Sequence, residues 1–127
     1  MLSYLIVFLG AGLGGGLRHG VNSLSIKLLG SGWPVGTLAI NVVGSFLMGA
    51  LGGWFLVRTG SSQAWRLFLT TGVLGGFTTF STFSLEAVLL YERGALLQAT
   101  LYVVGSVGLG VIALVAGLAL ARHFGTA

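Results

Sequence analysis

The sequence contains no cysteine and no aspartate, and its only acidic residues are Glu86 and Glu92. Without thiols the chain has neither disulfides nor a thiolate metal site. The two glutamates and the two histidines are dispersed along the chain, so they form no catalytic or metal-binding pattern. The sequence therefore predicts a protein that is not an enzyme.

Charge is also scarce. Charged residues make up 6% of the chain and hydrophobic residues 55%, and the mean hydropathy is +1.02. A soluble domain is about 25% charged, so this composition predicts an integral membrane protein in contact with lipid. The six basic residues stand singly, which argues against a nucleic-acid-binding surface, and we expect no nucleic-acid partner.

Four apolar segments are long enough to cross a bilayer, which takes roughly 20 residues as a helix. We expect them at about 1–29, 34–57, 67–91 and 95–121, as a single four-helix transmembrane domain over residues 1–127. No Lys or Arg precedes the first segment and no clear cleavage site follows it, so we interpret it as a retained span rather than a signal peptide. Four spans place both termini on the same side.

Glycines at intervals of four predict close helix packing, because small residues let helix backbones approach in a membrane. This spacing occurs at Gly12, Gly16 and Gly20 in the first segment and at Gly49 and Gly53 in the second.

The third segment carries an unusual stretch, Gly75 to Ser84, in the middle of an uncharged run from Leu67 to Leu85. Adjacent glycines weaken a helix, and nearby hydroxyls can bond the backbone groups that a break frees. We expect the third helix to be broken near Gly75–Thr79. Broken helices at membrane depth are tolerated where they are buried or line a cavity, and they often form ion sites.

Three phenylalanines, Phe77, Phe80 and Phe83, recur every three residues in this stretch. Aromatic rings are positive at their edges, so a row of edges in a dry site favours a small anion. Hydroxyl donors are interleaved with the rings at Thr78, Thr79, Ser81, Thr82 and Ser84. Alternatively, the rings face lipid or pack, and the hydroxyls bond back to the helix.

Polar residues interrupt two other segments at helical spacing. Asn41 lies inside the second segment, where an amide either bonds another helix or offers its N–H donors to a permeating anion. Thr37 and Ser45 are one turn away on either side and extend a polar stripe. A second stripe in the fourth segment consists of Gln98, Tyr102 and Ser106.

Arg18 interrupts the first segment. It either caps the span at the interface, pairs with a partner, or supplies positive potential at a water-filled vestibule.

The basic residues divide evenly between the two ends of the four predicted spans. One end holds Arg58, Arg66 and Arg122, and the other holds Arg18, Lys27 and Arg93. The positive-inside bias that normally sets orientation is therefore absent, which predicts insertion in both orientations. Two chains related by an axis in the membrane plane would form an antiparallel homodimer, with the glycine-rich faces in contact.

These residues together resemble the Fluc/CrcB family of fluoride channels over all four segments. The resemblance rests on Gly12 to Arg18, on Gly36, Thr37 and Leu38 followed by Asn41, and above all on the specific run from Gly75 to Phe83. It implies a small, four-span, dual-topology dimer of the inner (plasma) membrane that exports fluoride passively and relieves its toxicity.

The resemblance also implies roles for individual residues. The fluoride pathway would be lined by Asn41, Phe80 and Phe83, with Thr79 and Ser81 nearby and Tyr102 and Ser106 as the polar track of the fourth helix. Arg18 matches the first-helix arginine of the family and Glu86 its third-helix glutamate. Backbone carbonyls at Gly75 and Thr78 would hold a structural sodium ion at the dimer centre. Gly110 stands where many members carry a serine.

A different class of small dual-topology protein, the proton-coupled exporters of the multidrug-resistance kind, is the alternative. By resemblance to that class, such an exporter would need a membrane-embedded glutamate in its first span. The first segment here has no acidic residue. A packing subunit of a larger complex would explain the glycines, but it gives no reason for Asn41 or for the alternation of Phe with Ser and Thr.

Overall fold

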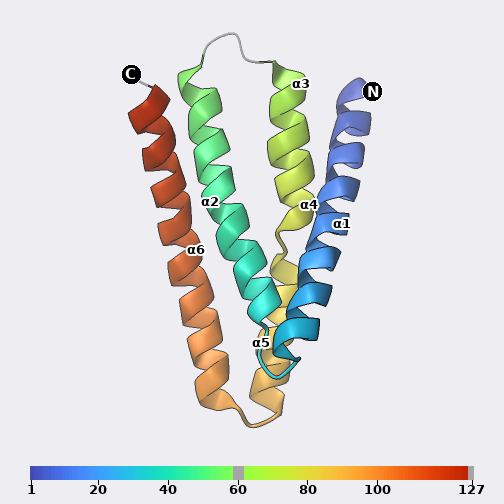
Figure 1. The fold of residues 1–127 in the computed structure, drawn as a ribbon, viewed down its shortest axis with the longest axis vertical. Helices are drawn as coiled ribbons and strands as arrows, with labels where there is room; N and C mark the ends of the chain where they lie inside the picture. The colour runs from blue at the N-terminus through green and yellow to red at the C-terminus, as the bar shows by residue number, and fades with distance from the viewer. Residues whose placement is uncertain (59–61, 126–127) are drawn as a thin grey trace.

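The computed structural model describes residues 1–58 and 62–125, and every regular element within them is helical. Four long helical stretches run side by side along the molecule (Figure 1). In chain order the elements are α1 (Leu2–Leu29), α2 (Val35–Val57), α3 (Gln63–Arg66), the π-helix η1 (Leu67–Leu74), α4 (Gly75–Phe77), α5 (Phe80–Glu92) and α6 (Leu96–Gly125).

Successive stretches alternate in direction, so the two termini lie at the same end of the molecule (Figure 1). The shared end of the two termini agrees with the prediction that they lie on one side, and the number of spans stays a prediction. Of the described helical stretches, three are long and apolar enough to cross a membrane: Val35–Leu56, Gln63–Glu92 and Leu96–Gly125. The helix α1 is not among them. It has 28 residues and carries Arg18 and Lys27 in its second half.

Glycines bring α1 against the first half of the third stretch. A Cβ at Gly14 would overlap the carbonyl oxygen of Val73, and one at Gly10 would lie 2.7 Å from the carbonyl oxygen of Phe68. Within this chain the packed glycines are Gly10 and Gly14, whereas contact of Gly12, Gly16 and Gly20 with a second chain stays a prediction. Gly12, Gly16 and Gly20 face open space, because they lie on other sides of the same helix.

The helices α2 and α6 form the second close pair (Figure 1). A Cβ at Gly49 would overlap the carbonyl oxygen of Leu114, and one at Gly53 would lie 2.8 Å from Cβ of Ala121. The prediction of a packing surface at Gly49 and Gly53 is therefore confirmed.

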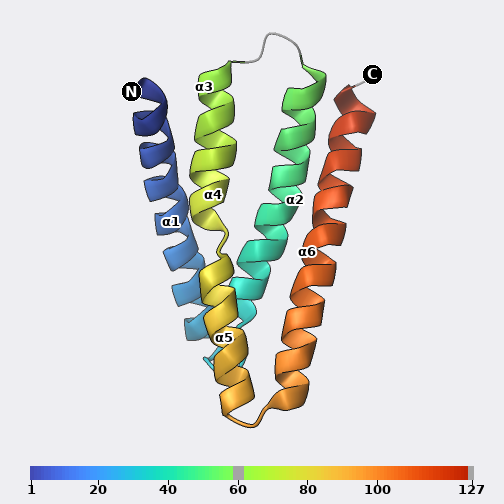
Figure 2. The ribbon, with the colours of Figure 1, turned by 180° about the vertical axis from the view of Figure 1, so that it is seen from behind.

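The third stretch is not a uniform α-helix. It is wider than an α-helix through η1, returns to α-helix at Gly75, and is interrupted at Thr78 and Thr79 before α5 begins. Figure 2 shows the interruption as a narrow connection between α4 and α5. The break lies within the predicted range, but the glycines are not where it occurs. Gly75 and Gly76 are helical, and a Cβ at Gly76 would overlap the carbonyl oxygen of Ala11, so Gly76 serves close packing against α1.

Candidate functional site

The break places two threonines in extended backbone conformation. Thr78 has φ −80° and ψ 157°, and Thr79 has φ −150° and ψ 123°. A helix that ends inside a membrane leaves carbonyl and N–H groups without their usual partners, and each must be bonded elsewhere. The hydrogen-bond partners of these carbonyl and N–H groups determine the chemistry of the site.

Asn41 of α2 bonds the second half of the break. Its amide nitrogen donates to the carbonyl oxygen of Thr79 at 2.9 Å, and its Oδ1 accepts from the backbone N–H of Thr79 at 2.8 Å. The amide thus satisfies both main-chain groups of one residue, 38 positions away in the sequence. Of the two roles predicted for Asn41, the interhelical hydrogen bond is present, and one N–H of its NH₂ group is used in it.

Thr79 is also the N-cap of α5. Its hydroxyl oxygen accepts from the N–H of Thr82 at 3.2 Å, as threonine does at a helix N-terminus. The hydroxyl lies 3.1 Å from Oγ1 of Thr82 and 3.5 Å from Oγ of Ser81, so three hydroxyls gather at this point. Other hydroxyls of the stretch bond back to their own helix, as the alternative predicted: Thr78 donates to the carbonyl oxygen of Leu74 and Ser84 to that of Phe80.

These bonds divert the N–H groups that a continuous helix would send to two carbonyl oxygens. The N–H of Thr79 would bond the carbonyl of Gly75, and the N–H of Thr82 would bond that of Thr78. Because the first donates to Asn41 and the second to the side chain of Thr79, neither carbonyl has its helical partner. These are the two residues predicted to hold sodium, and carbonyl oxygens suit a hard cation.

Arg18 of α1 bonds the helical end that precedes the break. Its Nε donates to the carbonyl oxygen of Gly76 at 3.1 Å. The helical partner of that carbonyl would be the N–H of Phe80, which lies beyond the interruption. Arg18 also lines a polar pocket of about 220 Å³ that includes Asn22, Thr79 and Thr82. The predicted place of Arg18 at a water-filled vestibule stays a prediction, and its bond to the Gly76 carbonyl is not one of the contacts that the sequence predicted.

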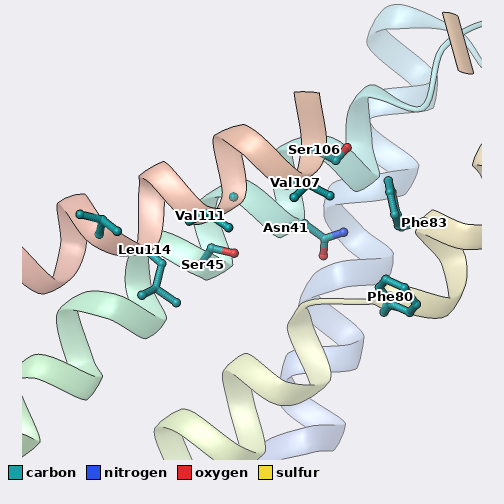
Figure 3. Close-up of a pocket in the computed structure, with 10 residues that line it drawn as sticks. Asn41, Ser45, Phe80, Phe83, Ser106, Val107, Val111 and Leu114 are labelled. Carbon is teal, nitrogen blue, oxygen red and sulfur yellow. The ribbon is translucent and has the colours of Figure 1, made fainter. Parts of the chain in front are cut away.

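A larger groove, of about 390 Å³, lies on the other side of Asn41, between α2, α5 and α6. Figure 3 shows Asn41 with its amide nitrogen turned toward the rings of Phe80 and Phe83. No charged side chain lines it among the described residues. The lining residues are Asn41, Ser45, Phe80, Phe83, Ser106, Val107, Gly110, Val111, Leu114 and Val115.

The two rings differ in their surroundings. Phe83 is 9% exposed and packs on Tyr102 with ring centroids 5.1 Å apart, whereas Phe80 is 78% exposed. Their own centroids are 5.8 Å apart. Trp33 continues the row beyond Tyr102, at 5.8 Å and nearly perpendicular. One ring is therefore fixed by packing, and the other is open on a single chain.

Two hydroxyls beside this row lack partners. The hydroxyls of Tyr102 and Ser106 are buried and bond no group in the described part of the chain. Buried polar atoms are nearly always bonded, so unpaired ones call for a water, an ion or a ligand. Ser106 lines the groove itself, while Tyr102 lies behind Phe83.

A carboxylate lies close to the same region. The Thr37 hydroxyl donates to Oε1 of Glu86, and Thr37 is almost fully buried. The stripe of Thr37, Asn41 and Ser45 is thus divided, since Thr37 bonds Glu86 and the other two line the groove. The stripe on α6 is divided as well, because Gln98 is exposed.

The whole sequence was compared with those of known proteins and protein families. Residues 5–118 match the family described as CrcB-like protein, Camphor Resistance (CrcB). The chain belongs to the CrcB-like family. Two Methylobacterium proteins named fluoride-specific ion channel FluC are similar to this CrcB-like chain over 98% of its length and all of theirs, at 64% identity for the M. nodulans protein and 63% for that of strain 4-46. A protein of the same name from Rhodopseudomonas palustris BisB5 is 57% identical over 95% of this chain and 98% of its own.

Proposed function

We propose that the protein is a passive, fluoride-selective channel that releases fluoride from the cytoplasm and so relieves its toxicity. One observation carries the proposal: an uncharged groove in which two phenylalanine rings, an amide and an unpaired serine hydroxyl meet. Its relatives named fluoride-specific ion channel FluC support the choice of ion.

Fluoride is small and strongly hydrated, so a pore must replace its water with hydrogen-bond donors. In the proposed pathway Asn41 and the hydroxyl of Ser106 supply donors, and the hydroxyls of Thr79, Ser81 and Tyr102 lie nearby. The edges of Phe80 and Phe83 add a weaker attraction from their positive rims. Weak attraction lets the ion leave again, which conduction requires as much as binding.

The groove calls for a second chain. The Phe80 ring is 78% exposed, so on one chain the ion would meet donors and rings from one side only. We infer an antiparallel dual-topology homodimer of four-span chains in the plasma membrane, in which the partner closes the groove. The even division of basic residues between the two ends supports it. The open glycines of α1 offer a surface for helix contact.

The resemblance to the family also implies a structural sodium ion. The donor set fits this ion, because the carbonyl oxygens of Gly75 and Thr78 have lost their helical partners and unwound carbonyls favour a cation. When bound, sodium would supply fixed positive charge beside an anion path.

The alternative, a proton-coupled exporter, is not favoured. By resemblance to that class, such an exporter would need a carboxylate in the first span, and α1 contains none. The one acid near the groove, Glu86, bonds Thr37.

The test is ion efflux from liposomes that contain the purified protein and are loaded with either fluoride or chloride. We expect rapid fluoride efflux without an imposed proton gradient, and chloride retention equal to that of protein-free liposomes. Fluoride retention equal to that of protein-free liposomes would end the proposal. Efflux that appears only with a proton gradient would favour the exporter.

A further inference from the structure

Arg18 has a contact whose purpose the channel proposal leaves unexplained. Its guanidinium faces the helix break, where the Nε–H donates to the carbonyl oxygen of Gly76. We propose that Arg18 is a positioning residue that fixes the end of α4 just before the break, as Asn41 fixes Thr79 within the break, and that this hydrogen bond matters more than the positive charge of the side chain. The proposal rests on the proposed channel function for its flux measurement only.

The packing of α1 places Arg18 for this task. Gly10, Gly14 and Arg18 follow one another at intervals of four and so share a helix face. The two glycines bring that face against the backbone of η1 and α4, where a Cβ at Gly14 would lie 2.8 Å from the N–H nitrogen of Phe77. One turn further along, a long side chain reaches the next unpaired group, the carbonyl of Gly76.

The bond has an energetic reason. The carbonyl of Gly76 faces an interruption instead of the next helical turn, and an unbonded carbonyl at membrane depth is costly. Arg18 is itself partly buried, so its guanidinium gains a strong acceptor. Without it, the carbonyl is expected to find another donor by a shift of α4 relative to α5, which would move Phe80 away from Asn41.

Side chains of different length and charge at position 18 can separate the effect of the hydrogen bond to Gly76 from the effect of the positive charge. The Nε2 of glutamine is as many bonds from Cα as the Nε of arginine, so Arg18→Gln keeps an N–H donor at that point without the charge. Arg18→Met has a similar size and no donor, and Arg18→Lys keeps the charge but places a methylene where Nε stood. Lys27→Gln, in the last turn of the same helix, is the control for the loss of a cation from α1.

Two measurements are made on the purified, membrane-reconstituted variants: fluoride efflux, and hydrogen exchange of backbone amides in the peptide that spans the break. We expect Arg18→Gln to conduct about tenfold faster than Arg18→Met, the difference expected for one hydrogen bond to a buried carbonyl. We expect Arg18→Lys to conduct no faster than Arg18→Gln. Exchange should be accelerated in Arg18→Met and close to that of the parent in Arg18→Gln and Lys27→Gln.

Equal flux in Arg18→Gln and Arg18→Met, with Arg18→Lys near the parent, would overturn the proposal in favour of charge. Equal exchange at the break in all variants would overturn it as well. If the parent carries no fluoride, the channel function fails, and the exchange comparison of Arg18→Gln with Arg18→Met still decides the role of Arg18.

Discussion

The side-chain amide of Asn41 bonds both the carbonyl oxygen and the N–H of Thr79, so one residue of α2 holds both main-chain polar groups at the start of α5. The same amide lines the groove beside Phe80 and Phe83. Structure and proposed function therefore depend on the same group, and substitutions must separate them.

Asn41→Asp is the first such substitution. It keeps the size of the side chain, removes the donor to the Thr79 carbonyl, and places negative charge in the proposed anion path. We expect fluoride efflux to fall by about 100-fold or more. The new carboxylate repels both the Thr79 carbonyl oxygen and the permeating fluoride, and each repulsion should raise the free energy by at least as much as the loss of a hydrogen bond to a charged group. Gln98→Glu, an amide-to-acid change at an exposed position of α6, is the control and should conduct normally. Normal efflux from Asn41→Asp would remove Asn41 from the pathway.

Phe80→Ile tests the open ring. Because this ring is 78% exposed on the chain, its loss should leave the stability of the protomer nearly unchanged while efflux falls. Phe8→Ile, at a ring of α1 that is 73% exposed, should change neither property. Thermal unfolding in detergent and liposome efflux are the two measurements. A destabilised protomer with normal efflux would show that Phe80 is a packing residue.

Phe83→Ile should behave differently from Phe80→Ile. Phe83 is 9% exposed and packs on Tyr102, so its truncation should destabilise the protomer by roughly 1–3 kcal/mol in addition to reducing efflux. Unfolding in detergent, compared with Phe80→Ile, checks this. Equal stability of the two variants would contradict the observed packing.

Gly14→Ala and Gly16→Ala form a matched pair on α1. A methyl group at Gly14 would overlap the Val73 carbonyl, and such overpacking costs roughly 1–3 kcal/mol. Gly16 faces open space within the chain, where alanine should stabilise the helix by up to about 1 kcal/mol. Unfolding of the detergent-dispersed protomer should show opposite signs. Unchanged stability of Gly14→Ala would contradict the packing of α1 on η1, and a loss of stability at Gly16 would show that this face is also packed, as in the proposed dimer.

Orientation can be tested directly because the chain has no cysteine. Ser31→Cys and Ser62→Cys place single thiols at opposite ends of the molecule, both at exposed positions. If chains insert in both orientations, a membrane-impermeant thiol reagent applied to intact cells should label each variant in part. Complete labelling of one variant and none of the other would reject dual topology.

The sequence predicted the helical class and the region of the break, because these follow from local hydropathy and from the paired glycines Gly75 and Gly76. The break lies within the predicted range Gly75–Thr79, but reasoning from the weakness of Gly75 and Gly76 did not locate it at Thr78 and Thr79, because both glycines are helical. A break occurs where its exposed backbone can be bonded, and that depends on Thr79 and on the distant Asn41.

Several features of the site had no local signal. The pairing of Arg18 with Gly76 and that of Thr37 with Glu86 join residues 58 and 49 positions apart. The π-helical geometry of η1 is also a feature that the sequence did not predict. Spacing alone also could not predict that Gly14 rather than Gly16 packs against η1, because each glycine belongs to a set spaced four residues apart.

The exposed ring of Phe80 has a genetic consequence. If a partner must complete the groove, every channel contains the products of two translation events. A conduction-defective copy that still folds would then combine with intact copies in the same cell and spoil the mixed assemblies. Such an allele would be dominant, which a pore enclosed by one polypeptide would not show.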